Sequence, residues 1–301
     1  MKLIESNVEY IPQAEGLEGI YRQIELAGRT AYKSEDKITE GSAKKFVDML
    51  IRNKHNAALE HSTVYLKRKG DVTDVRNEIF IDFYRRNPYS RVVFSNGIYY
   101  ITTNLRVLQE NNCLDDLKYI CEHTKNHEKR YTFKFTCDRG ISHELVRHRA
   151  FSPLQESTRF CNYMMDKFGN EITCIIPSWT NLIAGNSYNT EIAEICNRTE
   201  GISLIDQRFL VSVCAAEHQY MQMLKEGLTP QQARAVLPNA LKTELVMTGF
   251  SSDWRNLLDL RYFEKTGPVH PDMKVLMQKL SSLMHVTGVW DNVMKYPSKF
   301  D

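Results

Sequence analysis

Residues 131–149 read YTFKFTCDRGISHELVRHR and contain three structural signals in succession. Aromatic side chains alternate with threonine and lysine through 131–137, which predicts a β-strand. Asp138-Arg139-Gly140 is typical of a turn, and residues 141–149 fit a short helix. We expect the strand to pair with residues 60–66, EHSTVYL, where β-branched and aromatic side chains are also concentrated.

The segments on either side continue this mixture of strands and helices. Hydrophobic spacing and turn residues delimit each of them. The expected strands are 2–10, 157–163, 172–176 and 242–248, and the expected helices run through 17–26, 46–51, 200–226, 229–236, 252–263 and beyond Pro271. The chain is therefore predicted to have an α+β fold.

Residues 67–130 differ from their surroundings. They are heavily charged, contain an amphipathic pattern near 73–86, and end in the run CEHTKNHEKR. Asn96-Gly97 lies between RVVF and IYYITT, which predicts a β-hairpin with a two-residue turn. We predict one catalytic domain spanning 1–301, with an inserted subdomain at about 67–130.

The composition excludes several classes of protein. In 301 residues, 42% hydrophobic and 25% charged side chains are typical of a soluble globular protein. The 39 basic and 37 acidic side chains leave a charge of +2, which does not indicate a general nucleic-acid binder. The first residues, MKLIESNVEY, carry charge where a signal peptide is apolar, and no run approaches the roughly 18 apolar residues of a membrane span. Seven cysteines without a CxxC pair fit reduced thiols. We therefore expect a cytoplasmic protein, in a bacterium or in the host of a virus or phage.

The densest chemical signal lies at 147–159. Three arginines, a histidine, a carboxylate, an amide and three hydroxyls fall within these positions. Guanidinium groups suit phosphate and carboxylate oxygens, and a small polar loop adds hydroxyl and backbone N–H donors. These residue types fit a site for an anionic ligand, and they fit a solvated basic helix end equally well.

The order of these residues resembles the signature of flavin-dependent thymidylate synthases. Arg147-His148-Arg149, seven residues and then Ser157 match the family's RHR-x7-S pattern, and 155–160 (QESTRF) resemble its continuation. His55 with Glu60-His61 is similar to the family's His-x4-Glu-His segment. Ala233-Arg234-Ala235-Val236-Leu237-Pro238 with Thr243, and Asn256 with Leu260-Arg261, follow in the family's order. The resemblance covers about 1–66 and 131–285.

The resemblance implies a central antiparallel or mixed sheet flanked by helices, and it implies roles for individual residues. FAD would be bound by His55, Arg147, His148, Arg149, Gln155 and Asn256. The substrate dUMP would be bound by Glu144, Arg147, Gln155, Glu156, Ser157, Thr158, Arg159, Arg234 and Arg261. Arg261 and Ser157 would serve catalysis, Arg261 by favouring ionisation of the uracil ring and Ser157 by positioning it.

The family also implies a reaction and an assembly. It methylates dUMP to dTMP with 5,10-methylenetetrahydrofolate and NADPH as co-substrates, in a homotetramer whose active sites are shared between subunits. Neither a metal nor a membrane is expected, and nucleic acid is not the expected partner. A flavoprotein with only NAD(P)H oxidase activity is the alternative within the fold, because Phe250-Ser251-Ser252 replaces the family's usual flavin-contacting Asn-x-Arg.

Three other patterns in the sequence suggest a metal site or a nucleic-acid surface. His143 to His148 has the spacing HExxxH, which rotates the two histidines by about 140° on a helix and does not suit one metal ion. Cys121, His123 and His127 are a second metal candidate, or else a solvated helix end. The basic residues of the insert suggest a nucleic-acid surface as an alternative, although acidic residues interleave with them; they are Lys67, Arg68, Lys69, Arg85, Arg86 and Arg91.

Overall fold

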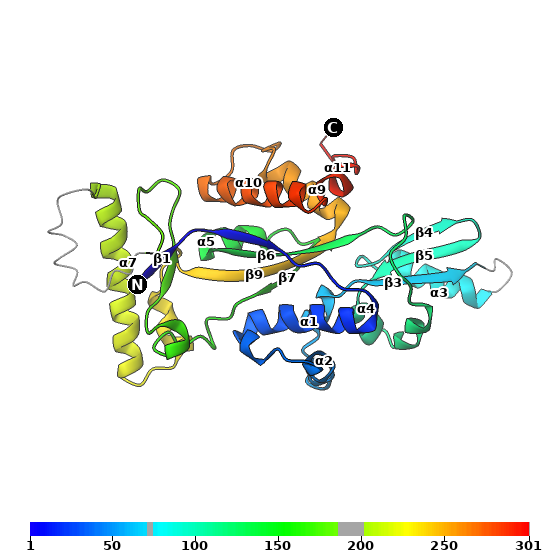
Figure 1. Cartoon of the computed structure of the whole chain (residues 1–301), viewed down its shortest axis with the longest axis horizontal. Coiled ribbons are helices and arrows are strands. Elements are labelled where there is room, and N and C mark those ends of the chain that lie inside the picture. Colours follow the sequence, from blue (N-terminus) through cyan, green and yellow to red (C-terminus); the bar gives the residue numbers. More distant parts are fainter. Residues whose placement is uncertain (71–74, 186–201, 301) are drawn as a thin grey trace.

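A four-stranded antiparallel sheet forms the centre of the molecule in the computed structural model, which describes residues 1–70, 75–185 and 202–300 (Figure 1). The order of its strands is β2-β6-β9-β7. Their bounds are β2 (Asn7–Tyr10), β6 (Arg130–Asp138), β9 (Lys242–Phe250) and β7 (Ser152–Gln155). The longest pairing joins β6 to β9 along their full lengths, from Arg130 opposite Phe250 to Asp138 opposite Lys242. The α+β fold with a central antiparallel sheet is confirmed.

Helices cover both faces of this sheet. Figure 1 shows α1 (Gly16–Tyr32) and α2 (Ser42–Arg52) on one side, and α9 (Ser251–Arg261), α10 (Pro271–Val286) and α11 (Trp290–Met294) on the other. Along β6 only Lys134 and Asp138 are not buried, which is the pattern of a strand covered on both faces. All of these helices except α11 are predicted from the hydrophobic spacing.

The predicted partner of residues 131–137 is wrong. Residues 60–61 belong to a 3-10 helix, η2 (Asn56–His61), and the strand that follows is β3 (Val64–Lys69). β3 pairs with β5 (Ile98–Thr103), which also pairs with β4 (Arg91–Ser95), so these three strands form a separate sheet. Strand alternation records which face of a strand is buried, and it carries no information about the partner.

The segment 67–130 contains the predicted hairpin and helix. Asn96 and Gly97 join β4 to β5 with φ angles of 51° and 72°, as a two-residue primed turn requires. The other elements of the segment are α3 (Val75–Arg86), α4 (Leu105–Glu110) and η3 (Leu114–Tyr119). Leu66, Ile81 and Ile101 join the hydrophobic cluster of α1 and α2, so this segment shares its core with the N-terminal helices. The division into one domain with an insertion stays a prediction.

The predicted strand 2–10 is divided between two sheets. Its first part is β1 (Lys2–Ile4), which pairs in parallel with β8 (Thr173–Ile175), and its second part is β2. A hydrophobic cluster joins β1 and β8 to α7 (Leu204–Lys225). The predicted helix 229–236 consists of α8 (Pro230–Ala233) and η5 (Arg234–Val236). Two further 3-10 turns are η1 (Glu35–Lys37) and η4 (Asp166–Phe168).

Two predictions around the motif need correction. No strand forms at 157–163, which is loop and turn; the strand is β7, which begins before Pro153. β7 lies at the edge of the sheet, where a proline is tolerated because one side of the strand needs no ladder hydrogen bond. The helix predicted over 141–149 is α5 (Arg139–Leu145), which is capped by Asp138 and ends before the RHR triplet. None of the helices that the structure describes is long and apolar enough to cross a bilayer.

Candidate active site

The RHR triplet lies in the turn between α5 and β7. α5 ends at Leu145, and the chain then reverses so that β7 runs antiparallel to β9. Arg147 and Arg149 are exposed in this turn, whereas His148 is half-buried. The turn therefore presents two guanidinium groups to solvent and directs an imidazole inward.

Arg261, at the C-terminal end of α9, contacts this turn. Its Nε donates a hydrogen bond to Nε2 of His148 at 3.1 Å, and its Nη1 lies 3.3 Å from Oε2 of Glu144. Burial, followed by the charges of Arg261 and Arg147, lowers the pKa of His148 to about 4. The imidazole is therefore neutral at pH 7 and carries its proton on Nδ1, because Nε2 accepts from Arg261. Three residues that the sequence assigned to one site are in contact.

Gln155, at the end of β7, is held in one orientation by a chain of hydrogen bonds. The Ser142 hydroxyl donates its only proton to the Arg139 carbonyl at 2.9 Å. It must therefore accept from Gln155, whose Nε2 lies 2.8 Å from Ser142 Oγ and 3.1 Å from Thr243 Oγ1. Both amide protons are used, and within the described residues Oε1 of Gln155 has no partner. The side chain thus offers a fixed acceptor oxygen.

The motif loop, residues 156–160, is anchored on its backbone and on two polar side chains. Ser157 N–H donates to the Ala31 carbonyl at 3.2 Å, and Phe160 N–H donates to the Ser157 carbonyl at 3.0 Å, closing a turn. Arg234 Nη1 donates to the Thr158 hydroxyl at 3.1 Å, which brings a predicted nucleotide-binding arginine to the loop. The Arg159 side chain is exposed, and its guanidinium lies 5.8 Å from the centre of the Phe160 ring.

Glu156 is buried and belongs to an ion-pair network beneath the loop. Lys242 Nζ lies 2.9 Å from Oε2 of Glu156 and 3.0 Å from Glu244, and Lys33 lies 2.7 Å from Glu244. Burial opposes ionisation of Glu244, but the two ammonium groups outweigh it and lower the pKa of Glu244 to about 2. A cavity of about 630 Å³ borders this network. The Glu156 carboxylate serves the fold as a counterion, and its contact with the substrate stays a prediction.

His55 reaches the loop through an aromatic side chain that the sequence interpretation missed. The Tyr32 hydroxyl lies 3.1 Å from Nδ1 of His55, and the Tyr32 ring packs against Phe160 with centroids 6.0 Å apart. Ser142 and Thr243 were missed as partners of Gln155. A signal existed for Thr243, which is part of the family-like segment after Pro238.

Among the described residues, no hydrogen bond or ion pair joins Asn256 to the motif loop. It lies on α9 five positions before Arg261, which corresponds to a rotation of about 140° around the helix. The two side chains therefore leave α9 in different directions.

The two metal candidates are not assembled. His148 lies beyond the end of α5, so His143 and His148 do not share a helix. Residues 121–127 form a loop rather than a helix, and His127 Nδ1 accepts from Thr124 N–H while its Nε2 lies 3.1 Å from the Leu66 carbonyl. No three His, Cys, Asp or Glu side chains of residues 1–70, 75–185 and 202–300 come together as a metal site.

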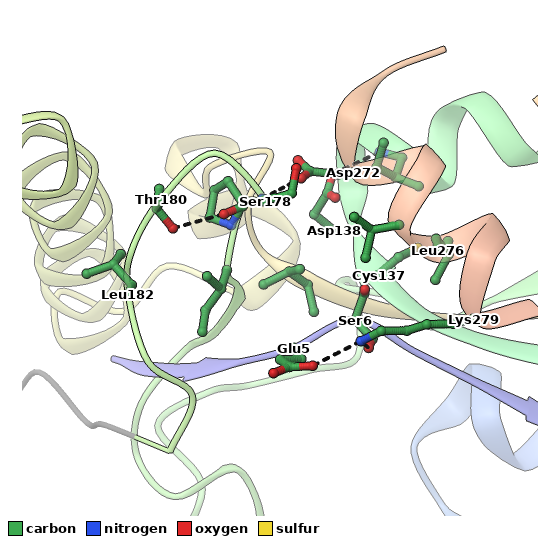
Figure 2. Close-up of a pocket in the computed structure, with 15 residues that line it drawn as sticks. Glu5, Ser6, Cys137, Asp138, Ser178, Thr180, Leu182, Asp272, Leu276 and Lys279 are labelled. Carbon is green, nitrogen blue, oxygen red and sulfur yellow. Dashed lines mark hydrogen bonds and ion pairs between the residues drawn. The ribbon is translucent and has the colours of Figure 1, made fainter.

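A separate cavity of about 180 Å³ lies near the opposite end of α5 (Figure 2). Its carboxylates are already engaged. Asp138 caps α5, Asp272 accepts from Ser178 N–H at 2.6 Å, and Glu5 accepts from Lys279 at 3.0 Å. An adjoining cavity of about 270 Å³ is lined by Asp138, Asp272 and also Glu144. Glu144, which pairs with Arg261, thus lies between the adjoining cavity and the candidate site.

The basic side chains of segment 67–130 make contacts inside the chain. The Arg68 guanidinium lies 4.1 Å from the centre of the Phe80 ring, and Arg86 forms an ion pair with Asp82 at 2.7 Å. Arg91 lies 4.2 Å from the centre of the Phe250 ring and 3.5 Å from Glu128. These contacts offer no specific support for a nucleic-acid surface.

The model of one protein family matches residues 99–285, more than half of the chain; its description is "Thymidylate synthase complementing protein". The chain belongs to this family. The match contains every predicted site residue except His55, and it begins inside the segment 67–130.

Relatives of this family member include flavin-dependent thymidylate synthases of two bacterial genera. The protein of Mycobacterium avium (strain 104) is 28% identical over 153 residues, which cover 50% of this chain and 54% of the relative. The protein of Corynebacterium efficiens is 31% identical over 143 residues, covering 46% and 49%. The chain thus matches about half the length of these relatives. A crystal structure of the UMP/dUMP methylase PolB from Streptomyces cacaoi, bound with 5-Br dUMP, is 15% identical and aligns over 98% of both chains with a TM-score of 0.42.

Proposed function

We propose that this member of the thymidylate synthase complementing protein family is a flavin-dependent thymidylate synthase. It would methylate dUMP to dTMP with 5,10-methylenetetrahydrofolate as the carbon donor and NADPH-reduced FAD as the hydride source. One observation carries the proposal. The motif loop is held in place by its own hydrogen bonds, while Arg147, Arg149 and Arg159 form no ion pair with any described residue. Exposed guanidinium groups that no carboxylate neutralises fit a ligand rich in phosphate oxygens.

The nucleotide would be bound by the loop and by the arginines that meet it. Arg159 and Arg234 would pair with the phosphate, and the Ser157 hydroxyl would position the pyrimidine. Arg261 would stabilise negative charge that develops on the uracil ring, since a cation fixed by Glu144 and His148 needs little reorganisation during the reaction. Neutral His148 can accept the hydrogen bond from Arg261, so it orients the guanidinium without adding a second positive charge beside it.

A nucleophilic thiol has little support among the described residues. Burial raises the pKa of all six described cysteines. Cys161 is the cysteine next to the motif loop, and burial together with the charge of Glu156 raises its pKa to about 12. Because a protonated thiol is a weak nucleophile, these cysteines suit a route that does without a covalent bond to the enzyme.

FAD, when bound, would supply the hydride. The residues that would hold it are His55, Arg147, His148, Arg149, Gln155 and Asn256. The donor set fits such a group, because exposed arginines suit its pyrophosphate and the fixed acceptor oxygen of Gln155 suits a ring N–H. Asn256 points away from Arg261 around α9, which supports a homotetramer with sites shared between subunits. Free thiols support a cytoplasmic location.

Release of tritium from C5-labelled dUMP tests the proposal. We expect release in the complete mixture of protein, FAD, NADPH and methylenetetrahydrofolate, and none when folate or FAD is omitted. NADPH oxidation without tritium release or dTMP would instead identify the oxidase. Absence of both activities from a folded protein that contains FAD would refute the proposed reaction.

A further inference from the structure

Three consecutive residues at the C-terminal end of α1 are connected to the motif loop. The Ala31 carbonyl accepts a hydrogen bond from Ser157 N–H at 3.2 Å. The ring of Tyr32 packs against that of Phe160, with centroids 6.0 Å apart. The third residue, Lys33, reaches the first residue of the loop through the buried ion-pair network. The end of α1 is therefore the part of the fold against which the loop is held.

Glu156, the first residue of the motif loop, is fixed by its carboxylate and by its backbone. Its Oε2 accepts from Lys242 Nζ at 2.9 Å and from Glu244 N–H at 3.2 Å, and its Oε1 accepts from the Cys161 thiol at 3.5 Å. Its own N–H donates to the Glu244 carbonyl at 2.8 Å. Both carboxylate oxygens thus accept hydrogen bonds inside the protein, so this side chain determines where the loop begins.

The network contains two ammonium groups and two carboxylates. Glu244 connects the lysines, because its Oε1 lies 3.0 Å from Lys242 Nζ and its Oε2 lies 2.7 Å from Lys33 Nζ. The four side chains are 2% to 16% exposed. Burial opposes protonation of Lys33, but the charges of Glu156 and Glu244 outweigh it and raise the pKa of this lysine. Loss of either lysine would leave two buried carboxylates with one counterion, which costs more than loss of an exposed ion pair.

The residues proposed to bind the nucleotide, 157–159, follow Glu156 directly. Their direction depends on the position of Glu156, since a small displacement of a supporting residue moves the groups that contact the ligand. We propose that Lys33 and Lys242 are positioning residues, which hold the motif loop against the end of α1 in the conformation that binds the nucleotide. The identity of the ligand rests on the proposed function, whereas the fixing of the loop does not.

Hydrogen–deuterium exchange of the full-length protein, detected by mass spectrometry, measures the opening of the motif loop. The N–H groups of Glu156, Ser157 and Phe160 are hydrogen-bonded, so their exchange reports on this opening. We expect these amides to exchange roughly 10-fold faster in Lys33→Met and in Lys242→Met than in the wild type, because an interaction with a charged group is lost. Amides of β6 should keep their wild-type rates, since the opening is local.

Lys134→Met is the matched control. It removes a lysine of the same sheet, which pairs with Glu9 at 3.1 Å, and it should leave the exchange of the loop unchanged. Lys242→Arg keeps the positive charge and should retain wild-type protection, because the cavity of about 630 Å³ beside this residue has room for a guanidinium group. If a methionine variant does not fold, Glu156→Gln carries the same test, since it removes the charge from the loop and keeps an acceptor oxygen.

Binding and turnover of dUMP separate positioning from a direct role in the reaction. Both methionine variants should raise the Kd and the KM for dUMP roughly three- to tenfold, because binding must then order the loop. At saturating dUMP, kcat should stay within about twofold of the wild type, and residues 156–160 should return to the wild-type rate of exchange.

Three results would overturn the inference. The first is exchange of the loop at the wild-type rate in both methionine variants. The second is faster exchange spread evenly over β6, β7 and β9, which would assign the lysines to global stability alone. The third is a lower kcat with an unchanged KM, which would assign them to the chemical step. A wild type that binds no dUMP would refute the proposed function, and the exchange rates would still decide whether the lysines hold the loop.

Discussion

Arg261 shows how single residues of the site depend on one another. Its guanidinium contacts His148 on one nitrogen and Glu144 on another, so the protein fixes its direction before any ligand binds. Arg261→Ala is expected to lower kcat/KM by roughly 100-fold or more, because one preorganised electrostatic contact is typically worth that much. Steady-state tritium release measures the effect. Unchanged melting temperature and oligomeric state are required, since their loss would mean that Arg261 is structural.

Thr243 helps to fix the orientation of the Gln155 amide. Thr243→Val removes one of the two acceptors that fix the Gln155 amide, so the side chain is free to rotate its oxygen away. The affinity for FAD or for dUMP should fall roughly three- to tenfold, the value of one hydrogen bond. Thr248→Val is the control in the same strand, because the Thr248 hydroxyl contacts His61 and Thr132 instead. Equal titration curves for both variants would remove the positioning role.

His148 makes the stability of the fold depend on pH. Burial and two arginines hold its pKa at about 4, below the ordinary 6.5 that it regains on unfolding. Between these pH values the unfolded chain binds a proton that the folded chain does not. The contribution of neutral His148 to the stability of the fold is therefore complete above pH 6.5 and is lost as the pH falls toward 4. Urea unfolding measures the free energy of unfolding at pH 7 and at pH 5. The decrease between the two pH values should be roughly 1–2 kcal/mol smaller in His148→Asn than in the wild type. His285→Asn is the control at an exposed position, and its free energy of unfolding should decrease between pH 7 and pH 5 as much as that of the wild type.

The sequence indicates the candidate site residues but not the contacts that hold them. Arg147, Ser157, Arg234 and Arg261 follow a family pattern that is readable without a structure. Lys33, Tyr32 and Ser142 are ordinary surface or helix residues in the sequence, and their contacts with Glu244, His55 and Gln155 arise only when distant elements meet.

Among the elements, β9 packs closely against Phe151, which follows the RHR turn. A Cβ atom on Gly249 would lie 2.6 Å from the Phe151 ring, which packs on Trp254 with centroids 4.5 Å apart. Gly249→Ala should therefore lower the free energy of unfolding by about 1–3 kcal/mol, the usual cost of overpacking. Thermal or urea unfolding checks this value. Phe151→Leu in the same chain should restore part of the loss, and additive effects of the two changes would contradict direct contact.

The type of an element was predictable where a hydrophobic pattern continues over several helical turns or where the residues specify one turn type. The helices α1, α7 and α10 and the Asn96-Gly97 hairpin follow from local chemistry. β7 was missed because Pro153 indicates a break unless the strand is known to lie at a sheet edge. The pairing of β6 with β9 joins residues more than 100 positions apart, and no local pattern records it.

For the whole molecule, the positions of Asn256 and Arg261 on α9 predict shared active sites. If each residue serves a different active site of a homotetramer, Asn256→Ala and Arg261→Ala remove different parts of the shared site, so each variant alone is inactive. Mixed oligomers, formed by dissociating and reassembling the two inactive variants together, should regain a fraction of wild-type tritium release. Reassembly of either variant alone is the control. No recovery in oligomers proven to be mixed would contradict sites built from more than one subunit.

The proposed reaction requires that the motif loop bind a pyrimidine monophosphate beside the flavin. A crystal structure grown with dUMP and FAD measures this directly. We predict density for the dUMP phosphate against residues 156–159 and Arg234, with the uracil ring near Arg261 and the isoalloxazine ring beside the RHR turn. If both ligands were bound elsewhere and the loop faced bulk solvent, the motif loop would not be the nucleotide site.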